Sequence, residues 1–220
     1  SRISFTSHGE NPSDLGKLNN ILIKGQLQEG KISIPPINLH LTEIFGEVVI
    51  SQGILQGTGL SARLDQSTGR EGSLQIGLTR DNDLFQLEMM VRADLAQTQG
   101  ILQGLVRAPA FTAELAKITK LQGTAHGKLT LGDSLHAIRA KVEVSEVALS
   151  ADYQRVPLPI TIAGGRLTFD KQMLGLDNLS GSLGQSQFAD LSCRFLWEKD
   201  LFLKIDSGRF DLAMAEFYPW

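Results

Sequence analysis

The sequence is poor in cysteine, in excess charge and in long apolar runs. One cysteine among 220 residues excludes a disulfide scaffold and any cysteine-rich metal site. The net charge of −3 argues against a nucleic-acid partner, because such proteins carry a clustered basic face. With 42% hydrophobic residues, the chain is also too apolar to be disordered. The counts allow one large globular domain or two small ones.

No stretch of the sequence has the pattern of a membrane-spanning or signal segment. Apolar runs such as Val48–Ile50 end after a few residues, far short of the about 18 to 20 needed to cross a bilayer. Residues Ser1–Phe5 lack the charged and then apolar order of a signal peptide. Because the chain does not begin with Met, we expect it to be an excerpt or a processed product, with any membrane anchor outside these residues.

The most frequent pattern is strict alternation of apolar and polar residues. Lys31–Ile34 and Lys141–Val144 are examples, and alternation places their apolar side chains on one face of a β-strand. Glycine-containing breaks such as Gly69–Gly72 separate these runs at short intervals. We therefore predict about twelve short strands joined by tight turns, which is the pattern of an antiparallel all-β fold.

One segment, residues 94–122, has a different spacing. Its apolar residues recur at the intervals of a helix. Asp94 is placed to cap a first helix, Pro109 divides the segment, and Gly123 follows its end. We predict a helical hairpin that lies over one face or end of the sheet. The chain is then a single β-rich segment with a first β-repeat region at 1–93, the helical hairpin at 94–122 and a second β-repeat region at 123–212.

An internal repeat links the two β-regions. A shift of 119 residues aligns 46–67 with 165–186 without a gap. Seven positions are identical, among them Gly46/Gly165, Leu60/Leu179 and Ser67/Ser186. Two amphipathic segments can match by coincidence. If the repeat is real, the sheet has grown by adding copies of one unit, each of which buries its apolar face against its neighbours.

No group of residues forms a catalytic, cofactor or metal site. Gly57–Ala62 fits a dinucleotide-binding pattern, but the alternation of Leu60, Ala62 and Leu64 predicts a strand where that motif needs a helix. The four histidines are scattered with no ligand spacing. Cys193 alternates in phase with apolar neighbours, as a buried residue would. We therefore expect a protein that is not an enzyme and that has no cofactor.

The apolar face of so many strands needs a cover. A hairpin of about 27 residues covers only part of a sheet that, at ~4.8 Å per strand, would extend roughly 55 Å. The sheet therefore either folds on itself as a sandwich or curls into a groove whose apolar floor binds an elongated apolar ligand. Ordinary core packing would explain each candidate groove residue equally well. The candidate lining residues are Val48, Ile50, Leu55, Leu167, Phe169 and Leu174.

Several motifs resemble one known family. Pro159–Asp170, followed by Leu176–Gly184, carries a pattern of Gly, Leu and Ser, and so does Gly30–Pro35 together with Gly46–Ile50 and Leu60–Leu64. These motifs are similar to those of the AsmA-like family of bacterial envelope proteins, which is related to the TamB and YhdP groups. The closing residues 213–220 resemble the start of a helix that such proteins carry between β-segments.

The resemblance implies a largely periplasmic protein of a Gram-negative bacterium, anchored in the inner membrane through a segment outside this chain. It also implies a repeating, extended and twisted antiparallel β-groove that binds or conducts phospholipid-like acyl chains between the inner and outer membranes. The alternative is a non-catalytic structural or interaction scaffold in outer-membrane or envelope assembly. In both cases we expect the open edges of the sheet to be capable of self-association.

Overall fold

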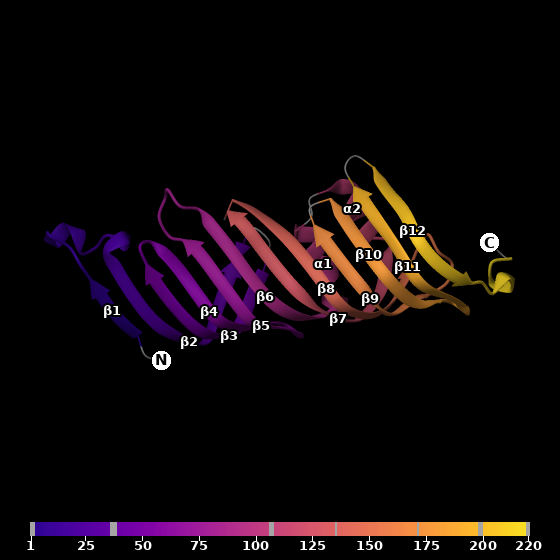
Figure 1. The fold of residues 1–220 in the computed structure, drawn as a ribbon, viewed down its shortest axis with the longest axis horizontal. Coiled ribbons are helices and arrows are strands. Elements are labelled where there is room, and N and C mark those ends of the chain that lie inside the picture. Colours follow the sequence, from indigo (N-terminus) through magenta and orange to yellow (C-terminus); the bar gives the residue numbers. More distant parts are fainter. Residues whose placement is uncertain are drawn as a thin grey trace. The chain divides into compact units, whose positions relative to one another are not determined.

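The protein is described by a computed structural model for residues 3–35, 39–105, 108–134, 136–170, 172–197 and 200–218. Within these residues the chain is mainly β. Twelve strands form one sheet in which each strand neighbours the strands before and after it in the sequence (Figure 1). The predicted antiparallel, mainly β fold with a short helical insert is confirmed. The strands belong to one sheet, rather than to the two sheets of a sandwich.

The helices and strands have the following bounds. The strands are β1 (Ile3–Ser7), β2 (Ile21–Ile34), β3 (Leu39–Ser51), β4 (Ile54–Leu64), β5 (Ser67–Gly77), β6 (Leu84–Asp94), β7 (Ile118–Ser134), β8 (Ala137–Tyr153), β9 (Ile160–Asp170), β10 (Met173–Leu183), β11 (Ser186–Trp197) and β12 (Leu201–Asp211). The helices are α1 (Leu95–Leu105) and α2 (Pro109–Leu115).

The chain divides into two compact units. The first unit consists of residues 1–91 and 128–140, and the second consists of residues 92–127 and 141–220. Each unit has its own part of the sheet. Both helices belong to the second unit.

The strands are longer than the alternating runs that predicted them, because β-bulges interrupt the alternation. In β2, Glu29 has a φ of 56° and the pairing with β3 shifts on either side of Gly30. A bulge adds one residue to a strand, so apolar side chains before and after it point to the same face although their spacing is irregular. The run Lys31–Ile34 is therefore only the end of β2, which begins at Ile21.

The two repeat segments fold alike. In the first unit Ile50 pairs with Leu55, and in the second unit the equivalent residues Phe169 and Leu174 pair in the same way. The equivalence also extends beyond the segments that the sequence matched. Residues Leu74 of β5 and Cys193 of β11, again 119 apart, occupy the same register positions on β4 and β10. The unit that is repeated is thus a three-strand set, β3–β4–β5 and β9–β10–β11.

A glycine and a leucine hold the bulge in each copy. Gly46 and Gly165 have φ values of +145° and +135°, which L-residues with a side chain rarely adopt. The side chain of a buried leucine lies against each glycine: Leu60 is 3% exposed and Leu179 is 2% exposed. This pair accounts for two of the seven identities in the sequence repeat.

The helical insert is shorter than predicted. Asp94 caps α1 as expected, since its Oδ1 accepts a hydrogen bond from the Ala96 N–H at 3.1 Å. However, α2 ends at Leu115 and β7 begins at Ile118, so the end of the predicted 94–122 hairpin is strand. Positive φ at Lys120 and Gly123 breaks the alternation there, which concealed the strand in the sequence.

The predicted helix start at 213–220 is also different in the structure. A single 3-10 turn, Met214–Glu216, follows β12. Hydrogen bonds tie this region to the β10–β11 turn, because Ser186 Oγ accepts from the Ala213 N–H at 3.0 Å and Glu216 Oε2 accepts from the Gln185 N–H at 2.8 Å. Residues 219 and 220 lie outside the described residues.

We predict that Gly165→Ala lowers the free energy of unfolding by about 1–3 kcal/mol, because the new Cβ would collide with Leu179 and the backbone φ is unfavourable. Urea denaturation measures this change. Gly100→Ala is the matched control. Gly100 lies in α1 with no atom within 4 Å of an added Cβ, so this variant should gain about 0.5–1 kcal/mol from helix propensity. Equal effects of the two substitutions would contradict the assigned role of Gly165.

Candidate apolar binding site

The first unit contains an apolar cavity of about 320 Å³. We call the sheet face that lines it the inner face. Its floor consists of buried side chains from the four consecutive strands β3, β4, β5 and β6. These floor residues are Ile44, Leu60, Ala62, Leu74, Phe85, Leu87 and Met89. The rim consists of half-buried or exposed residues, namely Ile32, Ser33, Pro35, Leu41, Ile76 and His136.

The cavity exists because the sheet of the first unit is curled. Ile32 of β2 and Phe85 of β6 line the same cavity, although their strands are four places apart in the sheet order. In a flat sheet they would be about 19 Å apart, too far to enclose one cavity of this size. The bulges at Glu29 and Glu43, with φ values of 56° and 48°, lie on the two neighbouring strands β2 and β3 and bend both.

Polar groups are few and lie at the rim. Ser33 and His136 are the polar side chains of the lining, and both are exposed. Ser33 Oγ is 2.9 Å from His40 Nδ1, so a hydrogen bond joins the two strands of the β2–β3 hairpin there. The floor itself offers no hydrogen-bonding side chain, which suits an apolar occupant.

The predicted lining residues of the first unit lie on the inner face but outside the cavity. The pairing register aligns Ile50 with Ile23 and with Leu55, and Leu55 with Ile76. These side chains form one half-buried apolar row that reaches the cavity at Ile76. Val48 pairs with Gly57 one row further along.

Of the predicted lining residues of the second unit, Phe169 lies in a packed core, and Leu167 and Leu174 are half-buried. Phe169 is 5% exposed, and its ring centroid is 6.1 Å from that of Phe111 and 5.9 Å from that of Trp197. Phe111 comes from α2, so the helical hairpin covers this face. Leu174 pairs with Phe169. Leu167 packs against a buried cluster around Val144 and Leu179.

The two copies of the repeat are covered differently: in the second unit Phe111 of α2 packs against Phe169 and Trp197, and both helices belong to that unit. Positions occupied by Gly57, Ile76 and Leu78 in the first unit carry Leu176, Phe195 and Trp197 in the second. Of these three positions only Ile76 lines the cavity. The floor positions of Ile44, Ala62 and Leu74 carry the smaller Ala163, Gly181 and Cys193 in the second unit, so the cover by the helices, and not side-chain size along the repeat, distinguishes the two faces.

None of the seven floor residues was among the lining residues predicted from the sequence. Phe85, Leu87 and Met89 alternate strictly in β6, so the period that identified other strands would have found them. Leu60 alternates with Ala62 and Leu74 alternates with Ile76, but alternation alone does not tell which part of an apolar face is left without a cover.

Ion pairs and hydrogen bonds of Glu114 hold the helical hairpin against the rest of the second unit. Glu114 of α2 accepts hydrogen bonds from Arg155 at 2.6 and 2.9 Å, from Lys117 at 2.7 Å and from the Tyr153 hydroxyl. The Arg155 guanidinium, with Lys117 and Tyr153, lowers the pKa of Glu114 to about 2. Burial and the same carboxylate raise the pKa of Tyr153 to about 12. Gln99 Nε2 of α1 donates to the Leu115 carbonyl at 2.9 Å, which joins the two helices.

We predict that Glu114→Gln lowers the Tm at neutral pH and that this difference disappears as the pH falls from about 4.5 towards 2. The pKa of Glu114 is lower in the folded state, about 2 against 4.5, so its contribution is present above pH 4.5 and is lost as the folded state takes up the proton. Thermal unfolding followed by circular dichroism at several pH values measures it. Glu146→Gln, at an exposed position of β8, is the control and should leave the Tm nearly unchanged. If the Tm difference between Glu114→Gln and the unsubstituted chain did not depend on pH, the ion pairs of Glu114 would not be what holds α2 in place.

Other kinds of site have no support in the described part of the chain. There, no three His, Cys, Asp or Glu side chains come together in a way that could hold a metal ion. No helix among those residues is both long and apolar enough to cross a membrane. Comparisons of the chain with known protein families, with curated proteins and with solved structures found no match. The function therefore has to be inferred from the geometry of the apolar cavity.

Proposed function

We propose that the first unit binds the acyl chain of a phospholipid-like lipid in the apolar cavity of its inner face. The observation that carries the proposal is the cavity itself, about 320 Å³ in volume with a floor of aliphatic and aromatic side chains. Protein cores are close-packed and rarely leave such a space unfilled. Ligand pockets, in contrast, begin at about 300 Å³.

The size of the cavity suits one acyl chain. An apolar cavity of about 150 Å³ holds one benzene, so a cavity of about 320 Å³ holds roughly a dozen carbon atoms. Each methylene removed from water contributes about 0.8 kcal/mol. A dozen give about 10 kcal/mol before the cost of association and of ordering the chain is subtracted. Micromolar binding, about 8 kcal/mol, is within this range.

The wider role that we propose is that of an AsmA-like envelope protein. In this role the β-groove would bind acyl chains or conduct them between the inner and outer membranes. The protein would lie in the periplasm and would be tethered to the inner membrane by a part outside this chain. The sequential strand order, the recurring bulges and the repeated three-strand set support a sheet that grows by addition and offers one apolar face to a lipid.

A non-catalytic assembly scaffold is the second candidate. It is favoured by apolar side chains that remain exposed at both ends of the strand order. Phe5 of β1 is 62% exposed and Ile205 of β12 is 57% exposed. Exposed apolar surface of this kind marks contacts with other molecules.

We predict that Ile76→Phe weakens binding of a fluorescent fatty acid of about twelve carbons by about tenfold, because excluding two methylenes costs roughly 1.6 kcal/mol. Phe is the residue at the equivalent position of the second unit, Phe195, so the backbone there accepts it. Gln75→Phe is the control, since Gln75 is the exposed neighbour on the opposite face of β5. Fluorescence titration gives the Kd of each variant, and circular dichroism checks the fold.

The same titration separates the two candidates. Loss of binding in Ile76→Phe with retained binding in Gln75→Phe supports the lipid site. If the unsubstituted chain binds no fatty acid and native mass spectrometry finds no co-purified acyl lipid, the lipid proposal fails and the scaffold candidate is favoured. Equal binding by both variants would place the probe outside the cavity.

A further inference from the structure

Strand β12 is an open edge of the sheet. One side of it pairs with β11, and among the described residues no strand pairs with its other side. All of its residues except Leu201 are exposed. An edge of this kind presents unpaired N–H and C=O groups and invites another strand. The side chains of β12 indicate which strand fits.

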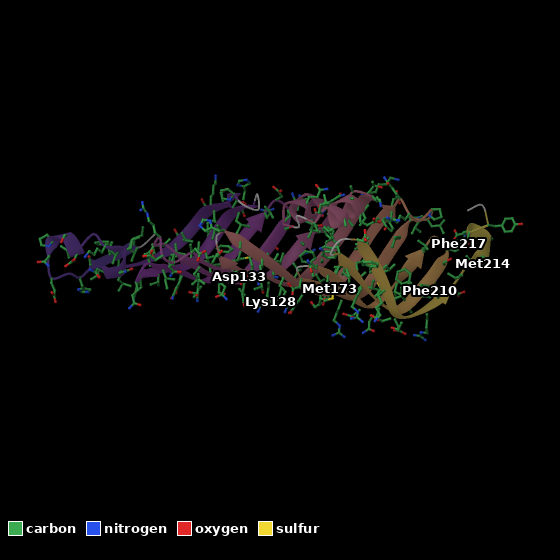
Figure 2. All side chains as sticks on the ribbon, turned by 90° about the horizontal axis from the view of Figure 1, so that it is seen from above. Lys128, Asp133, Met173, Phe210, Met214 and Phe217 are labelled. Carbon is green, nitrogen blue, oxygen red and sulfur yellow. The ribbon has the colours of Figure 1, made fainter. Side chains whose placement is uncertain are left out.

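The two faces of β12 carry different chemistry. Its register partners on β11 place Ile205 beside buried Cys193 and Phe210 beside half-buried Phe188, so both point to the apolar inner face. They are 57% and 53% exposed. Figure 2 shows Phe210 on β12 and Met214 in the turn that follows it. The inner face of β12 is therefore an apolar strip with no cover among the described residues.

The outer face of β12 is charged, with alternating sign along the strand. Asp206 forms a bidentate ion pair with Arg194 of β11 at 2.9 Å, and Arg209 forms an ion pair with Asp190. Lys204 lies 3.4 Å from Asp206. From Lys204 onward the strand thus has a charged outer side and an apolar inner side, and each side has a defined order of residues.

The order of charged and apolar residues along β12 is self-complementary when two copies of the strand run antiparallel. We propose that two copies of this chain pair through β12 in an antiparallel arrangement, with the two-fold axis passing between the two Gly208 residues. In this register Ile205 lies opposite Phe210 of the second copy, and Leu203 lies opposite Leu212. Lys204 lies opposite Asp211, and Asp206 lies opposite Arg209. Apolar residues face apolar residues, and each charge faces one of opposite sign.

The register agrees with the bulge in β12. Between Cys193/Ile205 and Ser192/Ser207 the pairing with β11 shifts, so Asp206 is an extra residue in the strand. Because of this shift, Ile205 and Phe210 share a face although they are five apart. With Asp206 and Ser207 together opposite Arg209 of the second copy, Gly208 lies opposite Gly208 at the two-fold axis, and opposite residues share a face along the strand.

The charges extend across the proposed interface as a network. Within one copy Asp190 pairs with Arg209, and Arg194 pairs with Asp206. Opposite Arg209 stands Asp206 of the second copy, so the signs alternate through both strands. Cross-strand pairs of opposite charge contribute roughly 0.2–1 kcal/mol each. Symmetry makes every pair occur twice.

The first test is the mass in solution. Sedimentation equilibrium of the 220-residue chain should give a species of twice 24.0 kDa. A monomer at every concentration tested overturns the proposal. Because acyl-chain binding is located in the first unit and β12 in the second, a failure of one proposal leaves the other standing.

The second test is a charge swap. Lys204→Asp places two acidic residues opposite each other at two symmetry-related positions, and we expect the dimer Kd to rise by about tenfold or more. The double variant Lys204→Asp/Asp211→Lys restores opposite charges and should restore the wild-type Kd. This rescue also shows that the strand still folds. An unchanged Kd in the single variant overturns this register.

The third test fixes the register directly. In the variant Lys204→Cys/Asp211→Cys, the two new thiols of one chain are seven residues apart, roughly 23 Å along a strand. That distance excludes a disulfide within the chain, so oxidation should give a covalent dimer on a non-reducing gel. Lys204→Cys alone is the control and should remain uncrosslinked. Crosslinking of the control to the same extent, or none in the double variant, overturns the pairing.

Discussion

The apolar inner face of the sheet has to be covered, and the rest of the structure depends on how this is done. Among the described residues all twelve strands belong to one sheet, and no second sheet packs against it. In the second unit a helical hairpin provides the cover, with Phe111 against Phe169 and Trp197. In the first unit the strands themselves bend, so that residues of β2 and β6 line the same cavity. The same three-strand set thus occurs with two kinds of cover, and the apolar cavity described above lies in the unit whose strands bend.

Bulges make both solutions available. Gly46 and Gly165 hold equivalent kinks, each against a buried leucine, while residues such as Glu29 and Glu43 bend the hairpin of the first unit. The register of β4 with β5 matches that of β10 with β11 although few of the side chains are alike. The backbone geometry is therefore set by a few turn and bulge positions, and the helical hairpin covers the apolar face in the second unit.

Alternation and breaks were sufficient to predict the antiparallel sheet, the helical insert and the repeat. Strand lengths were not predictable in this way, because a bulge such as that at Glu29 makes a continuous strand look like two short ones. Phe169 was a candidate groove residue because its alternation is the same as that of Ile50. Only the contact with Phe111, more than fifty residues away in the sequence, makes it core. The floor around Leu60 and Leu74 depends on glycines and long-range curvature, which local patterns do not encode.

The order of charges on β12 has a consequence for errors in assembly. While a chain of hairpins folds, each newly formed edge is exposed to strands of other molecules, and an uncharged apolar edge would accept many of them in several registers. Lys204, Asp206, Arg209 and Asp211 impose a sequence of signs that most intruding strands cannot match. A slip by one residue would also bring apolar side chains against charged ones. The outer face of this strand therefore acts as a filter against misassembly, whatever strand finally pairs with it.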